Sequence, residues 1–250
     1  MSAEETVPVA AAPVAAQAPH DEDMTLAQVN AKMNWLRAGV LGANDGIVST
    51  AGLVVGVAGA TTDRTALVVA GVAGLVAGAV SMAGGEYVSV STQRDTEVAL
   101  LEKERRELEE TPDEELAELA GFYRRKGLSV QTAQLVAVEL TAHDALRAHA
   151  EIELGIDGDS LVNPWHAALA SLVSFTLGAL LPLLAIVLPG SSARLPVTVV
   201  AVVAALTVTG AVSARLGGAP ALPAVARNVG VGLLAMALTF GVGTLVGGAL

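Results

Sequence analysis

The feature that most constrains this chain is the stretch from Leu67 to Thr92, which holds one charged residue, Glu86, and continues directly into a highly charged segment. About 20 apolar residues are enough for a helix to cross the hydrocarbon core of a bilayer. The stretch therefore predicts a transmembrane helix that runs without a break into an aqueous helix. The rest of the chain divides into membrane and aqueous parts around this junction.

The single acid in this stretch needs an explanation, because a carboxylate near the centre of a span costs about 2.5–3.5 kcal/mol on insertion scales. Met82 lies four residues before Glu86 and projects from the same face of a helix. A soft thioether next to a hard oxygen ligand suits a transition-metal ion in transit. A second polar pair, Asn44 and Asp45, interrupts another apolar stretch.

The composition predicts an all-α integral membrane protein. The chain is 53% hydrophobic and has 26 glycines but only 3% aromatic residues, a pattern typical of closely packed membrane helices. Five transmembrane helices are expected, at about 36–60, 66–92, 165–188, 195–216 and 224–250. Gly52 and Gly56 form a GxxxG face on the first of them.

Four regions follow from this pattern. Residues 1–22 are rich in Ala, Pro and acid and predict a disordered tail, whereas 23–92 hold the first two spans. Within the latter, residues 24–36 fit either a short helix at the membrane surface or an extension of the first span. Residues 93–160 predict an acidic aqueous insert, and 161–250 hold the last three spans.

The insert should contain three or four helices. Thr111 and Pro112 mark a helix start, with Thr111 as N-cap and Glu114 completing a capping box. Ser129 is a plausible N-cap for a further helix, and a short segment is expected from Asp144 onward.

The acids of the insert are periodic. Glu104 and Glu107 are three residues apart on the first helix, and Glu115 and Glu118 repeat this spacing on the second. Like charges at this spacing destabilise an isolated helix by a few tenths of a kcal/mol, which a bound cation would relieve. The alternative is an ordinary solvated face, neutralised in part by three nearby bases: Lys103, Arg105 and Arg106.

The distribution of charge along the chain limits which partners the protein can bind and how it is oriented in the membrane. The formal net charge is −11, and all 25 acids lie before residue 160, which argues against nucleic acid and favours cations. If the N-terminus and the insert are cytosolic, Arg64 and Arg194 are the only bases of 14 on the other side. The four scattered histidines and the absence of a nucleophile and base pair argue against an enzyme.

Two long phrases resemble the vacuolar iron transporter family: AGVLGANDGIVSTAGLVVGVAGA at 38–60 and AGAVSMAGGEYVSVSTQRD at 77–95. The acidic insert ending in ELGI at 153–156 and the three later spans extend the resemblance over nearly the whole chain from Asn34. It implies a homodimer of five-span subunits and a metal path along the dimer axis, lined by the first two helices. It also implies a cytosolic metal-binding domain of three helices and proton-coupled export of Fe2+ from the cytosol.

Residue by residue, the resemblance assigns the path to Asp45, Met82 and Glu86, with Asn44 beside them. It assigns metal binding in the insert to five acids: Glu104, Glu107, Glu115, Glu118 and Glu153. His149 stands where relatives often have methionine and is a borderline ligand. Glu151 is a further candidate with no firm counterpart.

The expected function is therefore a proton-coupled transporter of Fe2+, with Mn2+ as the second choice and Mn2+ or Zn2+ also possible in the insert. The alternative is a membrane-anchored metal sensor or buffer without transport, in which Asp45 and Glu86 are only hydrogen-bond partners between helices. A short chain with arginine in excess over lysine favours a bacterial inner membrane over a vacuole.

Overall fold

The computed structural model describes residues 26–156 and 162–249, with side chains from residue 39 onward. These residues form α-helices and one π-helical segment, without strands. The expected tail at 1–22 lies outside the described residues. The elements in chain order are α1 (Leu26–Ala60), α2 (Arg64–Glu110), α3 (Pro112–Arg125), α4 (Val130–His149), η1 (Ala150–Leu154), α5 (Pro164–Val187), α6 (Arg194–Leu216) and α7 (Ala221–Ala249).

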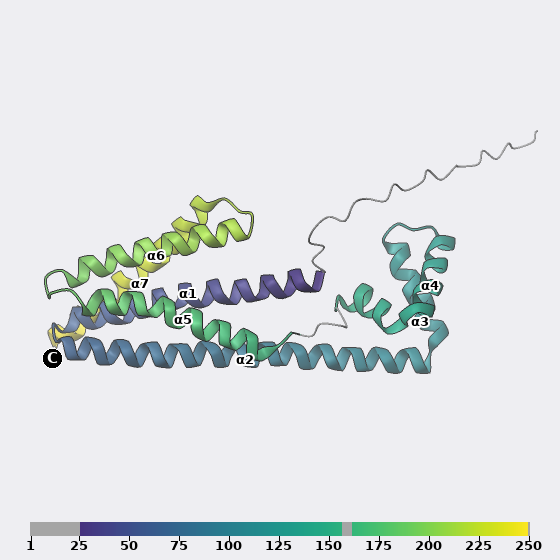
Figure 1. Cartoon of the computed structure of the whole chain (residues 1–250), viewed down its shortest axis with the longest axis horizontal. Helices are drawn as coiled ribbons and strands as arrows, with labels where there is room; N and C mark the ends of the chain where they lie inside the picture. Colours follow the sequence, from purple (N-terminus) through teal and green to yellow (C-terminus); the bar gives the residue numbers. More distant parts are fainter. Residues whose placement is uncertain (1–25, 157–161, 250) are drawn as a thin grey trace, which may run out of the picture.

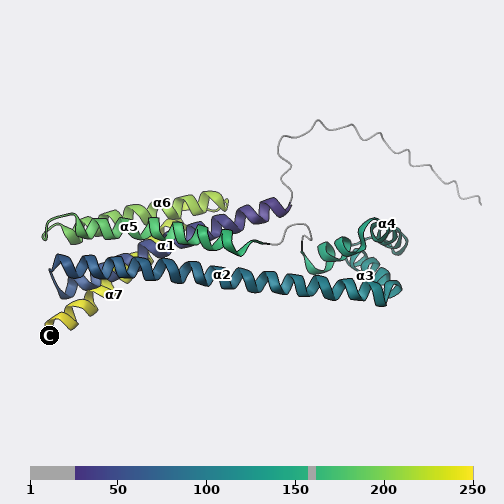
Figure 2. The ribbon, with the colours of Figure 1, turned by 60° about the horizontal axis from the view of Figure 1, so that its bottom comes forward.

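Five helices in the described part of the chain are long and apolar enough to cross a membrane: α1 from Gly39 onward, α2, α5, α6 and α7. This confirms the expected number of spans. Figures 1 and 2 show these helices side by side at one end of the molecule, while α3 and α4 stand at the other end. The long helix α2 joins the two ends.

Helix α2 is continuous over 47 residues, which corresponds to about 70 Å at 1.5 Å per residue. It begins after Asp63, whose side chain accepts a hydrogen bond from the Thr65 amide at 2.9 Å. It then passes Thr92 without interruption, as the sequence at this junction predicted. It ends before Pro112, because proline disfavours the helical conformation of the preceding residue, and Thr111 accordingly leaves the helical conformation with φ −135° and ψ 53°.

The capping box expected at Thr111 is wrong. The Thr111 hydroxyl makes no cap to α3, and instead it donates to the Glu107 carbonyl of the preceding helix at 3.2 Å. The Thr111 amide donates to the same carbonyl at 2.8 Å. Thr111 therefore closes α2, and Pro112, which has no amide hydrogen to satisfy, begins α3.

Helix α1 runs without a break from Leu26, so of the two alternatives for residues 24–36 the structure favours an extension of the first span. No glycine or proline interrupts residues 26–38, which is why the helix simply continues. Farther along, α1 packs mainly against α5 and α7.

Small residues allow these close crossings. A Cβ at Gly243 of α7 would overlap the carbonyl oxygen of Gly56, and a Cβ at Gly178 of α5 would overlap that of Ala43. The GxxxG face of α1 therefore packs against another helix of the same chain, where Gly52 and Gly56 both face Thr239. Apolar contacts fill the remaining space, as in the buried group Ile47, Ala51, Val55, Val202, Leu206 and Met236.

The helices between α2 and α5 have a small core of their own. Leu119 of α3 packs against Ala137 and Ala148 of α4. Ser129 caps α4 by accepting from the Thr132 amide at 3.2 Å. Asp144 then breaks the helical path with φ −161° and ψ 94°, and its carboxylate caps the following turns by accepting from the Arg147 amide at 3.0 Å. We call residues 93–156 the insert.

Candidate functional site

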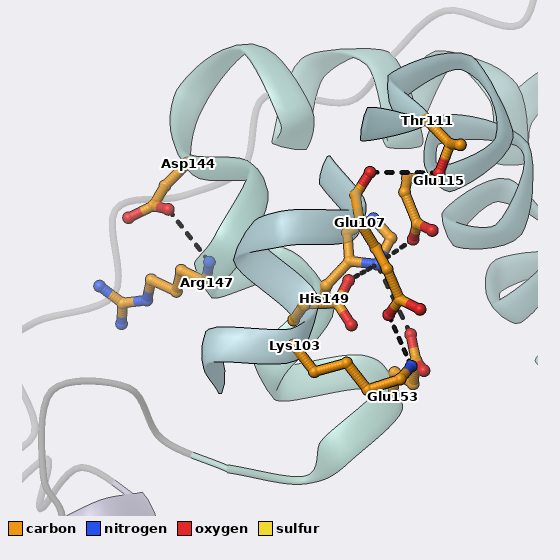
Figure 3. Close-up of polar contacts among 9 residues, drawn as sticks. Lys103, Glu107, Thr111, Glu115, Asp144, Arg147, His149 and Glu153 are labelled. Atoms are coloured by element: carbon orange, nitrogen blue, oxygen red, sulfur yellow. Dashed lines mark hydrogen bonds and ion pairs between the residues drawn. The ribbon is translucent and has the colours of Figure 1, made fainter. Parts of the chain in front are cut away.

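Three helical segments of the insert bring a buried cluster together. Glu104 of α2, Glu115 of α3 and His149 at the end of α4 each offer a ligand atom, and these atoms lie within 4.8 Å of one another. His149 is fully buried, and Glu104 is 2% exposed. The Nδ1 atom of His149 lies 2.8 Å from Glu104 Oε1, 3.6 Å from Glu115 Oε2 and 3.6 Å from Glu153 Oε2. In Figure 3, dashed lines join His149 to Glu115 and to Glu153.

The ends and breaks of the helices around the cluster determine where each of these side chains points. The end of α2 at Thr111 lets α3 turn back, so Glu115 meets Glu104. The break at Asp144 and the π-helical turn η1 then set the direction of His149 and Glu153, which are four residues apart. Gly155 ends this turn in the left-handed conformation, with φ 66°, which glycine adopts at little cost.

Glu104 Oε1, Glu153 Oε2 and both ring nitrogens of His149 form no well-aligned hydrogen bond among the described residues, although His149 Nδ1 lies 2.8 Å from Glu104 Oε1. A buried polar atom without a partner costs about 1–3 kcal/mol. Since the two nitrogens of an imidazole point apart, Nδ1 is the one that meets the carboxylates, and a cation among these atoms would satisfy them. Three carboxylates and one imidazole, without sulfur, form a donor set that suits Mn2+, Fe2+ or Zn2+.

The electrostatics of the cluster also favour a bound cation. Burial raises the pKa of Glu104 and of Glu115, and neighbouring carboxylates raise both further, while His149 acts in the opposite direction. The two carboxyl groups are thus held in surroundings that disfavour their charged form. A cation among them would favour that charged form.

Three other acids expected at this site do not join the cluster. Glu107 instead forms an ion pair with Lys103, with Nζ and Oε2 2.6 Å apart. Glu118 is exposed, and it is close enough only to contribute to the raised pKa of Glu115. Glu151 pairs with Arg147 at 2.8 Å on the exposed side of its helix. The structure therefore groups Glu104, Glu115, His149 and Glu153.

A second constellation lies between α1 and α2 in the membrane-spanning part. Asp45, Met82 and Glu86 line one cleft of about 420 Å³. The residues that line this cleft also include Ser49, Ser81 and Phe175, which the sequence analysis did not single out. Ser49 lies one helical turn beyond Asp45, so the i,i+4 rule is the signal that identifies it.

The cleft has a definite order along the membrane. Gly74 packs against Leu53, so Asp45 lies level with Met82 on the antiparallel neighbour, and Glu86 lies about one turn of 5.4 Å closer to the insert. Asn44, which was expected with this group, does not line the cleft. Its Oδ1 is buried without a hydrogen-bond partner in the described chain.

The two constellations are linked by α2. Glu86 and Glu104 are 18 residues apart, which is five full helical turns, so both project from the same side of the helix about 27 Å apart. In Figure 1 the spans and the insert indeed lie on one side of α2.

Five apolar helices and an acidic helical insert define an α-helical integral membrane protein with two groups of cation-ligand side chains. Comparison with known proteins narrows this class. The model of the VIT family matches residues 36–244. A vacuolar iron transporter of Acanthamoeba castellanii is 45% identical over 219 residues, covering 84% of this chain and 78% of the relative.

Other relatives show the same match. Vacuolar iron transporter homolog 2 of Arabidopsis thaliana is 37% identical to this chain. The match covers 91% of this chain and 92% of the length of that relative. VIT-like transporter 1b of Glycine max is 35% identical over 90% of this chain and 82% of the length of that relative. The chain belongs to the VIT family.

Proposed function

We propose that the protein is a proton-coupled transporter that exports divalent transition metal from the cytosol, with Fe2+ as the first substrate and Mn2+ as the second. The names of its relatives support iron as the cargo. The observation that carries the proposal is the single helix α2, which bears Met82 and Glu86 in the cleft and Glu104 in the insert.

The insert acts as the cytosolic receiver of the metal. The Glu104, Glu115, His149 and Glu153 cluster supplies oxygen and nitrogen donors, and the unpartnered atoms of this cluster are satisfied when a cation binds. The distribution of basic residues supports the cytosolic side, because all but two of the Lys and Arg side chains then lie there. The same rule supports an N-terminus on the inside. We propose a bacterial inner membrane, which the excess of arginine over lysine in a short chain favours.

The cleft acts as the path across the membrane. An ion leaving the insert meets Glu86 first and the level of Asp45 and Met82 one turn later. Carboxylates must release protons to bind metal, so these groups serve both ions of an exchange. Asp45 and Ser49 are exposed at the surface of the subunit, so we propose that a second copy completes the path as a symmetric homodimer.

The test is metal flux into sealed proteoliposomes that contain the purified protein and an internal metal-quenched dye. Fe2+ kept reduced by ascorbate and Mn2+ should both enter, and a pH dye should report protons moving the opposite way. Protein-free vesicles and Ca2+ serve as controls. Metal binding without flux would overturn transport and favour the membrane-anchored sensor or buffer.

A further inference from the structure

Two basic residues next to Glu104 form ion pairs with different acids. Lys103 and Arg105 both lie on the exposed surface of α2, next to Glu104 in sequence. Arg105 pairs with Glu102 on its own helix. Lys103 instead reaches Glu107 with an Nζ to Oε2 distance of 2.6 Å, and Figure 3 shows its side chain extending toward Glu107 and Glu153.

The field acting on Lys103 comes mainly from Glu107, with a further contribution from the cluster. The hydrogen bond to Glu107 raises the pKa of the Lys103 ammonium most, burial opposes this rise, and the charges of Glu107, Glu104 and Glu153 raise the pKa further. Two members of the buried cluster, Glu104 and Glu153, therefore act on this ammonium group. The side chain itself is 59% exposed, so it lies at the rim of the cluster and not among the buried donors.

A lysine side chain can act as a movable positive charge at the edge of the cluster. Its ammonium is a compact point charge on a flexible stem, it carries hydrogen-bond donors only, and it stays protonated here. It cannot act as a metal ligand in that form. It can be displaced by another cation, because an exposed ion pair on a helix surface is weak.

We propose that Lys103 is a tethered cation that competes with the incoming metal at the rim of the Glu104, Glu115, His149 and Glu153 cluster and thereby sets how readily the metal leaves. This inference rests on the proposed metal binding by that cluster. In the structure the ammonium pairs with Glu107. When metal binds, the repulsion between the two cations weakens the hold of the cluster, which suits a transporter that must release its cargo.

The decisive variant is Lys103→Met, which removes the charge and keeps the length of the side chain. One charge removed at a partly exposed rim should tighten Mn2+ binding about three- to tenfold at low salt, and the gain should shrink as salt is raised. Lys103→Arg keeps the charge and should bind like the unaltered protein. Arg105→Met is the matched control, since it removes one positive charge from the same helix, and its effect should stay below about twofold.

The experiment measures Mn2+ binding to the full-length protein in detergent by the loss of the free-ion electron paramagnetic resonance signal at two salt concentrations. A selective, salt-sensitive gain in Lys103→Met supports the proposal. Equal behaviour of Lys103→Met and Arg105→Met would overturn it while leaving the metal site intact. If the unaltered protein binds no Mn2+ and no Fe2+, the proposed metal site itself fails, and this inference fails with it.

A second readout separates competition from simple loss of structure. In proteoliposomes, Lys103→Met should lower the KM for Mn2+ and also lower kcat, because a more tightly held ion is released more slowly. A disrupted insert would raise KM instead, which would contradict the proposal.

Discussion

The cluster in the insert and the cleft in the membrane use similar side chains in opposite ways. In the insert, Glu104 and His149 are buried, and their polar atoms converge within 4.8 Å. In the cleft, Asp45 is exposed at the surface of the chain, and Glu86 lies about one helical turn closer to the insert. A compact buried donor set holds an ion, whereas spaced donors along an open cleft pass it on. The contrast fits the proposed function, with capture in the insert and transit in the cleft.

The largest effect should come from the cleft. Asp45→Asn removes a carboxylate and proton acceptor without changing its size, so flux of Fe2+ and Mn2+ into proteoliposomes should fall at least about tenfold. Metal binding by the insert should stay unchanged, because Asp45 does not belong to its cluster. Asp63→Asn is the matched control, since Asp63 caps α2 outside the cleft and asparagine caps equally well. Rapid flux with normal pH dependence in Asp45→Asn would remove the distinction between the two regions.

The next effect concerns the insert. Glu104→Gln keeps the shape of a buried ligand and removes its charge, so Mn2+ affinity should fall about 10–100-fold, on the order of the loss seen when metal-site partners are mutated. Glu102→Gln, on the exposed surface of the same helix, should leave the affinity unchanged. Isothermal titration of the full-length protein measures both. Equal affinity in the two variants would mean that the cluster is a solvated acidic face, the alternative that the sequence left open.

The pH dependence of stability should follow from the same burial. The pKa of Glu104 and of Glu115 is raised in the folded insert, mainly by burial. A raised folded-state pKa gives stability that is complete below the ordinary glutamate pKa of about 4.3 and is lost as pH rises through the raised value. The metal-free insert should therefore open more readily at pH 7.5 than in mild acid.

Hydrogen exchange of residues 112–125, corrected for intrinsic rates, measures this opening after metal removal. Glu104→Gln should reduce the pH dependence and protect the metal-free insert at neutral pH, although the same substitution weakens metal binding. Glu102→Gln should do neither. Exchange that is slower at neutral pH than in acid would contradict the expected sign.

The smallest effect should come from the thioether of the cleft. Met82→Leu keeps volume and apolarity but deletes the sulfur, so Fe2+ flux should slow by a few fold while the harder Mn2+ is affected less. Initial rates for the two ions, measured in the same vesicle preparation, give the ratio directly. An unchanged ratio would show that Met82 serves packing alone, in keeping with its contact with the Ala79, Phe175 and Ala179 core group.

Much of the fold follows from the sequence because the bilayer limits the choices. Apolar length alone predicts the five spans, and the sudden change in charge after Thr92 predicts the aqueous extension of α2. Helical periodicity likewise places Met82 and Glu86 on one face. These inferences concern a single helix at a time, and the structure confirms the spans and the continuity of α2.

Tertiary structure decided which of the periodic acids meet. Glu104 and Glu107 differ by three residues, yet only Glu104 faces α3 and α4, while Glu107 lies at the edge and pairs with Lys103. The spacing of acids along one helix cannot show which side a neighbouring helix covers. That side depends on where the chain turns, here at Thr111 and at the break at Asp144.

The same reason applies to the cleft and to the small-residue crossings. The sequence shows that Asp45 and Gly56 lie in one apolar helix, but the level at which α1 meets α2 and α7 is fixed by contacts such as Gly74 with Leu53 and Gly243 with Gly56. Helix periodicity is a local property of hydrogen bonding along one segment. The relative height and rotation of two helices come from packing between residues far apart in the chain, so only the folded structure determines them.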